Sequence, residues 1–234
     1  MARKKIFSPG EYYHIYSRTI LNIPEFKNKK NASRLAEAFL LANSTESTKA
    51  FMHLRNYSSG ISEKVLDILQ QGERLVDILS FVIMPDHYHL LLREKKKNSI
   101  TDFIRKCNTS IAKYINIKEN RKGPLFESRF KAKHVDSNEY LLHLSLYIHL
   151  NPLDFLDSKD WRKGNLKNWQ SKEKKLLDYP WSSLKSFVDN NHEDLIISGA
   201  EIILDQFDNK DEYKRFLQRW SECRLSELDS LIIE

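Results

Sequence analysis

The pattern of apolar and polar positions divides the first half of the chain into strands and helices. Short aromatic and β-branched stretches predict strands over Glu11–Arg18 and over Leu75–Arg93, where Pro85 marks a bulge or break. Apolar residues at helical spacing predict helices over Asn31–Leu41 and Ser99–Ile117. The alternation is irregular and lacks glycine-rich turns from strand to helix, which indicates an α+β fold with an antiparallel sheet.

The pattern then predicts one more strand and a strongly apolar helix. Residues Glu127–Val135 alternate strictly, with Arg129, Lys131 and Lys133 on one predicted face. This strand should therefore have one basic side. A helix is expected from Asn138 to about Leu150, and it is apolar nearly all round.

Two polar segments interrupt this pattern. Residues 43–62 are rich in Ser, Thr and Asn and are expected to form a loop, followed by a short helix over Glu63–Gln70. Residues 43–62 could also be an inserted segment. Residues 161–177 form a second polar segment, which carries Lys and Trp.

Charge separates the body of the chain from its C-terminal end. The 234 residues carry a net charge of +6, but residues 1–187 carry +13 and residues 188–234 carry −7. A basic body is typical of proteins that bind a polyanion, although it also fits a well-solvated surface. We expect residues 1–187 to form the main domain. Residues 188–234 should form an acidic extension with short helices over Ile202–Phe207 and Tyr213–Trp220.

Composition excludes several classes of protein. Hydrophobic residues make up 41% of the chain, yet no apolar run approaches the ~20 residues that a membrane span requires. The two cysteines, Cys107 and Cys223, are far apart in the sequence, which argues against a disulfide scaffold or a zinc knuckle. We expect a cytoplasmic protein.

Two histidines in the predicted β region suggest a metal site. His87 and His89 are two positions apart, so in a strand both imidazoles project from the same face, roughly 6–7 Å apart. Two neutral imidazoles so placed can share one divalent cation. A lone His-x-His pair is more often a pair of partly buried histidines with backbone partners, and a metal site needs a third ligand.

The apolar helix offers that ligand and a nucleophile. Tyr147 and Asn151 are four residues apart and therefore neighbours on one helix face. Asn151 can supply an amide oxygen to a cation, and Tyr147 can supply a phenol that needs activation. Tyr147 could equally be a core residue. The basic strand between these elements fits a nucleic acid backbone, or an ordinary solvated strand.

Taken together, these segments resemble the REP-associated tyrosine transposases, which belong to the single-strand HUH class. The resemblance spans about residues 10–187, and it is specific because the matching motifs occur jointly and in order. Residues 18–26 lack the Gly/Asn-rich turn of that family, and the stretch 43–74 is longer than in its compact members. The matching motifs are residues 84–92 (MPDHYHLLL), 123–133 (GPLFESRFKAK), 147–152 (YIHLNP) and 179–183 (YPWSS).

The resemblance implies a fold and a set of site residues. His87 and His89 match the pair that binds Mg²⁺ or Mn²⁺, Asn151 matches the third metal ligand, and Tyr147 matches the catalytic tyrosine. The implied fold is a ferredoxin-like antiparallel sheet with helices packed on it and with the His-Tyr-His motif on a central strand.

The resemblance also implies a reaction. The chain would cleave and rejoin single-stranded DNA beside a hairpin through a 5′-phosphotyrosine intermediate, as a monomer or a homodimer. Arg129, Lys131, Lys133 and Arg18 are the candidates for contacts with the DNA backbone. One alternative is a domesticated relative that binds hairpin DNA or RNA without cleaving it. Another is a metallohydrolase that uses the two histidines and water.

Overall fold

The computed structural model describes residues 7–56, 61–157, 159–164, 166–190, 192 and 194–222. Its centre is a four-stranded antiparallel sheet with the strand order β2-β3-β1-β4. The bounds of the strands are β1 (Tyr12–Arg18), β2 (Val76–Ile83), β3 (His87–Glu94) and β4 (Lys131–Val135). With helices α1 to α3 between β1 and β2, and α4 between β3 and β4, this order gives the ferredoxin-like topology that was expected, and β3 is a central strand.

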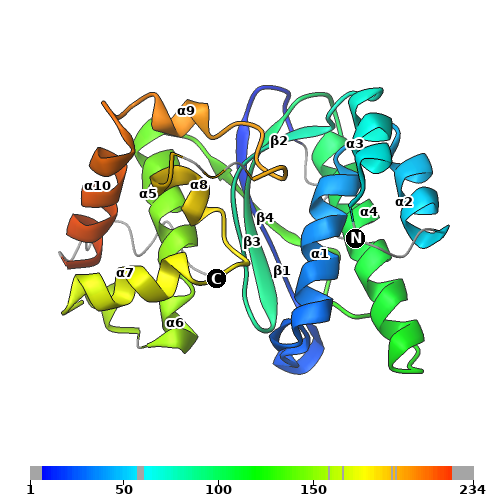
Figure 1. Cartoon of the computed structure of the whole chain (residues 1–234), viewed down its shortest axis with the longest axis horizontal. Coiled ribbons are helices and arrows are strands. Elements are labelled where there is room, and N and C mark those ends of the chain that lie inside the picture. Colours follow the sequence, from blue (N-terminus) through cyan, green and yellow to red (C-terminus); the bar gives the residue numbers. More distant parts are fainter. Residues whose placement is uncertain are drawn as a thin grey trace.

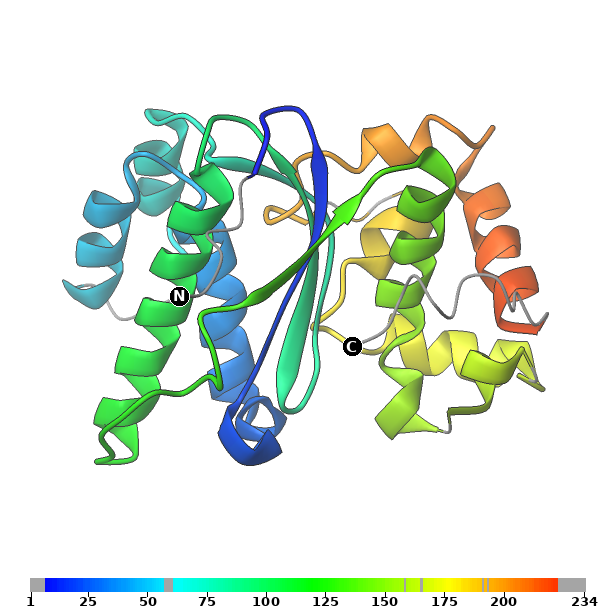
Figure 2. The same ribbon diagram turned by 180° about the vertical axis from the view of Figure 1, so that it is seen from behind.

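The helices form a layer on each side of the sheet (Figures 1 and 2). Those that precede β4 cover one face: α1 (Lys29–Ala42), α2 (Ser47–Asn56), α3 (Glu63–Gln70) and α4 (Ser99–Lys118). Those that follow β4 lie on the other face: α5 (Asn138–Leu150), α6 (Leu153–Leu156), α7 (Trp169–Leu177), α8 (Leu184–Val188), α9 (Glu201–Leu204) and α10 (Lys210–Glu222). Three short 3₁₀ helices complete the described elements: η1 (Ile20–Asn22), η2 (Glu25–Lys27) and η3 (Lys159–Lys163).

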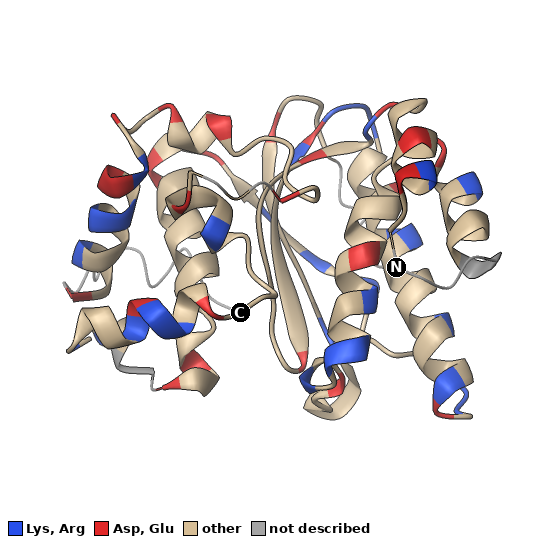
Figure 3. Ribbon diagram, viewed as in Figure 1, with Lys and Arg blue, Asp and Glu red and all other residues tan. Residues whose placement is uncertain are grey.

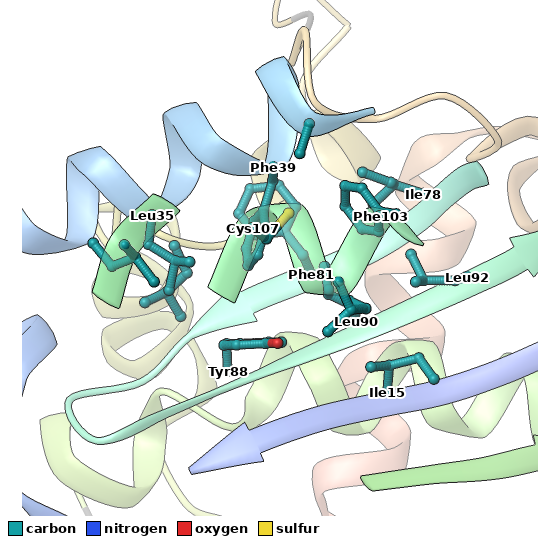
Figure 4. Close-up of a cluster of buried hydrophobic side chains, with 14 of the residues drawn as sticks. Ile15, Leu35, Phe39, Ile78, Phe81, Tyr88, Leu90, Leu92, Phe103 and Cys107 are labelled. Atoms are coloured by element: carbon teal, nitrogen blue, oxygen red, sulfur yellow. The ribbon is translucent and has the colours of Figure 1, made fainter. Parts of the chain in front are cut away.

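The register of the strands separates two hydrophobic cores. On β3, Tyr88, Leu90 and Leu92 point toward α1 and α4, where they meet Phe39 and Phe103 (Figure 4). The intervening residues of β3 point toward α5. Because side chains alternate across a strand, each strand contributes to both cores.

The second core joins the sheet to the C-terminal helices. Leu79 and Leu91 of the sheet belong to the same buried cluster as Leu144 of α5 and as Tyr213 and Leu217 of α10. Helices α9 and α10 confirm the two short helices expected near the C-terminus, and α10 shares its core with α5. The division at residue 187 stays a prediction.

Several expected elements are confirmed, and two details were wrong. The predicted loop over residues 43–62 contains the helix α2, which packs against α3 and α1. The strand predicted over Glu127–Val135 begins only at Lys131. The start of α4 is capped by the buried Glu94 carboxylate, which accepts hydrogen bonds from the backbone N–H groups of Ser99 (3.1 Å) and Ile100 (2.7 Å).

Two composition-based expectations can be placed on this fold. Cys107 is a buried free thiol on α4, whereas Cys223 lies outside the described residues. In the part of the chain that the structure describes, no helix combines the length and apolar character needed to cross a bilayer.

Candidate functional site

The two histidines of β3 lie side by side on the sheet face that α5 covers. Strands β2 and β3 form a hairpin whose turn contains Pro85 and Asp86, so His87 begins β3 directly after the turn. The ring centres of His87 and His89 are 4.9 Å apart, and the ring planes are nearly perpendicular. His89 is fully buried and His87 is 8% exposed.

A neighbouring side chain fixes each imidazole. Nδ1 of His87 is 2.6 Å from an Asp86 carboxylate oxygen, and Nδ1 of His89 is 2.8 Å from Nε2 of His14 on β1. Burial would raise the pKa of Asp86, but the hydrogen bond with His87 and the nearby positive charge of Arg18 help to lower it below its ordinary value. Ionised Asp86 only accepts, so His87 donates from Nδ1. Nε2 is then the nitrogen that can bind a cation.

Tyr147 of α5 packs against His89 and His14. Its ring centre is 5.6 Å from that of His89 and 6.3 Å from that of His14, in edge-to-face contacts, and the side chain is 2% exposed. Ser137 caps the start of α5 by accepting from the backbone N–H of Tyr140. The structure thus brings the predicted nucleophile and the predicted histidines together, while the ring of Tyr147 also belongs to the core.

Arg162 joins Tyr147 to Asn151. Asn151 is fully buried at the C-terminal end of α5, and its Oδ1 is 3.3 Å from a guanidinium nitrogen of Arg162. Another nitrogen of the same guanidinium is 3.4 Å from the Tyr147 hydroxyl. Asp154 on α6 anchors Arg162 with hydrogen bonds of 2.6–3.1 Å.

His149, also on α5, links this helix to neighbouring elements through buried hydrogen bonds. His149 is fully buried, with Nδ1 2.7 Å from the hydroxyl of Tyr213 and Nε2 2.9 Å from that of Ser183. Burial lowers the pKa of His149 to about 3, so the ring is neutral at neutral pH. These bonds connect α5 to α10 and to the residue before α8.

The strand pairing places most of the predicted DNA contacts on the same sheet face as the histidines. Tyr16 is paired with His89 and with Lys131, and Arg18 is paired with His87. Arg18 and Lys131 line a cleft of about 400 Å³ at the end of β1. Lys133, two residues further along β4, lies on the same face.

Arg129 does not share that face. It precedes β4, its carbonyl accepts a hydrogen bond from Asn108 of α4, and its side chain lines a separate cleft with Arg105. The expected alternation failed here because the chain is not yet extended at this point. Basic residues also occur on the helices of both layers (Figure 3), so charge alone does not mark the site face.

Several residues of the site gave no signal in the sequence. His14 sits in a predicted strand, but only the pairing of β1 with β3 brings it to His89. Asp154 and Arg162 follow the last matching residues of the apolar helix, and Arg162 lies in a segment with no periodic pattern. Their contact with Tyr147 depends on the path of the chain after α5.

The donor set is compatible with a divalent cation. Among the described residues, no group of three or more His, Cys, Asp or Glu side chains is placed to hold a metal. A site built on His87 and His89 therefore needs a ligand of another type, and the amide oxygen of the buried Asn151 is of a suitable type. Imidazole nitrogens and an amide oxygen are donors that divalent cations accept, and water and phosphate oxygens would supply the remaining ligands.

Comparison with known proteins places this site in a family. The family model described as "Transposase IS200 like" matches residues 29–151, more than half of the chain, and this range contains His87, His89, Tyr147 and Asn151. A solved structure of a REP-associated tyrosine transposase bound to a REP hairpin is similar in fold. It has a TM-score of 0.51 and 13% identity, over 85% of this chain and 92% of that one. A search of curated proteins gave no match. The chain belongs to the IS200-like transposase family.

Proposed function

We propose that this transposase cleaves and rejoins single-stranded DNA beside a hairpin, with Tyr147 as the nucleophile. The observation that carries the proposal is the position of Tyr147, whose ring contacts His89 while its hydroxyl lies within 3.4 Å of Arg162. A phenol held between a two-histidine motif and a cationic side chain is suited to attack on a phosphodiester. The hairpin in the structurally similar transposase supports a hairpin as the substrate feature.

In the proposed reaction, the Tyr147 oxygen attacks the scissile phosphorus and loses its proton to solvent. The bond from phosphorus to the 3′ oxygen breaks, and that oxygen takes up a proton to become a free 3′-hydroxyl. The product is a 5′-phosphotyrosine ester. Because the ester retains one phosphodiester-like bond, a second 3′-hydroxyl can attack it and release Tyr147, so strands are rejoined without ATP.

His87, His89 and Asn151 would hold the metal ion. A bound Mg²⁺ or Mn²⁺ would supply positive charge to the non-bridging oxygens of the phosphate. Asp86 and His14 keep the two imidazoles oriented for this role. Imidazole is an unusual ligand for Mg²⁺, which binds mainly oxygen, so both ions need to be tested.

Arg18, Lys131 and Lys133 are the proposed contacts with the DNA backbone on the site face, and Arg129 is a proposed contact outside it. The cleft between Arg18 and Lys131 opens beside Tyr16, whose ring lies 5.5 Å from the Lys131 ammonium group. A cationic cleft with an aromatic side chain suits a phosphate backbone with an unstacked base.

A nicking assay tests the proposal. Labelled single strands that contain hairpins are incubated with the protein and Mg²⁺ or Mn²⁺, and a covalent adduct is sought on a denaturing gel. We expect an adduct that Tyr147→Phe and a chelator abolish and that His89→Gln reduces strongly. Tyr114→Phe, at a partly buried tyrosine on α4, is the matched control and should leave the adduct unchanged.

The same assay separates the alternatives. Binding of hairpins without any adduct would favour a non-catalytic binding protein. Strand cleavage that survives Tyr147→Phe would favour a metallohydrolase that uses water, and either result would overturn the proposed reaction.

A further inference from the structure

We infer that Arg162 is a further catalytic residue, whose guanidinium orients the Tyr147 hydroxyl and stabilises the negative charge that this oxygen carries as it attacks. This inference rests on the proposed function and deepens it. Arg162 lies outside residues 29–151, the range that the family model matches, so its assignment comes from the contacts in this structure.

The first argument is the geometry of the guanidinium. One terminal nitrogen is 3.4 Å from the Tyr147 hydroxyl oxygen, and the other is 3.3 Å from Oδ1 of Asn151. Its central carbon is 5.2 Å from the centre of the Tyr147 ring and 4.8 Å from that of Trp161. The cation therefore lies over the ring of the nucleophile and also reaches its oxygen.

The second argument is the arrangement of charge. Asp154 accepts hydrogen bonds from Nε and from one terminal nitrogen of Arg162, at 2.6–3.1 Å, whereas the other terminal nitrogen faces Tyr147. Because a guanidinium group stays protonated in proteins, the positive end of this ion pair is directed at the phenol.

The third argument is that other side chains hold Arg162 in place. Trp161 donates from its indole nitrogen to Asp154 (2.8 Å), and its ring contacts that of Trp220 on α10 (5.9 Å). The carbonyl of Ser221, also on α10, accepts from the backbone N–H of Leu166. The segment that carries Arg162 is therefore fixed on the C-terminal helix, and its guanidinium is positioned before any DNA is bound.

The contact with Asn151 is compatible with this role. An amide oxygen has two lone pairs, so Oδ1 of Asn151 can accept from Arg162 and still face a cation. Arg162 would then connect the nucleophile with a metal ligand. A purely structural ion pair with Asp154 would not require the contact with the Tyr147 hydroxyl, and this difference makes the inference testable.

The test measures the pKa of the Tyr147 phenol directly. The protein is labelled with ¹³C at the ring carbon that bears the hydroxyl of tyrosine, and Tyr147→Phe identifies the signal of Tyr147. The full-length protein without DNA or metal is titrated as wild type and as Arg162→Gln, Arg162→Lys and Arg215→Gln. Arg215 is an exposed arginine on α10 and serves as the matched control.

We expect Arg162→Gln to raise the phenol pKa by about one unit or more, which corresponds to a tenfold change in the acid dissociation constant. Arg162→Lys should give a smaller rise because lysine keeps the charge but loses the planar fork. At neutral pH, the rate of adduct formation should fall at least about tenfold in Arg162→Gln and recover as the pH is raised. Arg215→Gln should match wild type in both measurements.

The outcomes separate the inference from the proposed function. An adduct in wild type together with an unchanged phenol pKa in Arg162→Gln would overturn the role of Arg162 alone. Faster adduct formation in Arg162→Gln would also overturn it, since Arg162 would then restrain Tyr147. Absence of any wild-type adduct would overturn the proposed function, whatever the titration shows. If Arg162→Gln does not fold, the Arg162→Lys titration decides.

Discussion

The hydroxyl of Tyr213 makes the C-terminal helix part of the support for the candidate nucleophile. It lies 2.7 Å from Nδ1 of His149 and 3.1 Å from Oγ of Ser145, both on α5, and Tyr213 is fully buried. Tyr213→Phe keeps the ring and removes both hydrogen bonds. Ser145 retains its hydrogen bond to the carbonyl of Leu142, so Nδ1 of His149 is the buried atom that loses its partner.

The expected loss of stability follows from the one buried nitrogen that is left without a hydrogen-bond partner. Leaving a buried polar atom without its hydrogen bond costs about 1–3 kcal/mol, so we expect the free energy of unfolding to fall by about 2 kcal/mol. This is a substantial share of the ~5–15 kcal/mol that stabilises a typical domain. With a urea m value of about 2–3 kcal/mol per molar, the unfolding midpoint should fall by about 0.7–1 M.

The assay is urea unfolding at neutral pH, followed by circular dichroism, on wild type, Tyr213→Phe and Tyr114→Phe. Tyr114 is a partly buried tyrosine on α4, so its substitution controls for the loss of a hydroxyl group as such. An equal m value with a lower midpoint in Tyr213→Phe alone would support the reasoning. If the midpoint of Tyr213→Phe moves no more than that of Tyr114→Phe, the hydrogen bond between α10 and α5 does not stabilise the protein.

Three further predictions concern other parts of the fold. Lys131→Gln and Lys133→Gln should each weaken DNA binding, measured by fluorescence anisotropy at several salt concentrations. In each variant, the slope of the logarithm of the binding constant against the logarithm of the salt concentration should become shallower by about one. Unchanged slopes would show that these residues make no phosphate contact. Burial lowers the pKa of His143 from 6.5 more than Glu139 raises it, so protonation favours the unfolded chain and stability is lost as the pH falls below about 6.5. Between about pH 7.5 and pH 5.5, the urea midpoint should fall less in His143→Gln than in wild type, and an equal fall in the two proteins would contradict this. Glu94→Gln should cost about 1–3 kcal/mol in urea unfolding because it removes the charge that caps α4, and an unchanged midpoint would contradict that account.

The sequence was most informative where one local pattern determined the structure. Helix start and stop signals gave the helix that carries Tyr147, and the His-x-His spacing placed both imidazoles on one face of β3. These features depend only on helix and strand geometry. The resemblance to a known family suggested their roles, and in the structure His89 contacts both His87 and Tyr147.

Features that depend on tertiary contacts could not be predicted in this way. Helix α2 was missed because its Ser, Thr and Asn residues favour turns, and its packing against α1 and α3 overrides that preference. Arg129 was placed on the basic face because alternation was extended beyond the true start of β4. Arg162 was missed because its partners lie on α5 and α6, and nothing in its own segment marks it.

The alternation of side chains on β3 has a consequence for how such a protein diverges. Neighbouring residues of this strand pack against different layers: Tyr88 is buried against Phe39 of α1, while His87 and His89 lie on the opposite face, where His89 contacts Tyr147. The sheet therefore acts as a partition, and the helices on the Tyr88 side can exchange residues, lengthen or acquire insertions while the reactive groups keep their spacing. Descendants of one ancestor could in this way differ widely over α1–α4 and still retain the same bond-making chemistry.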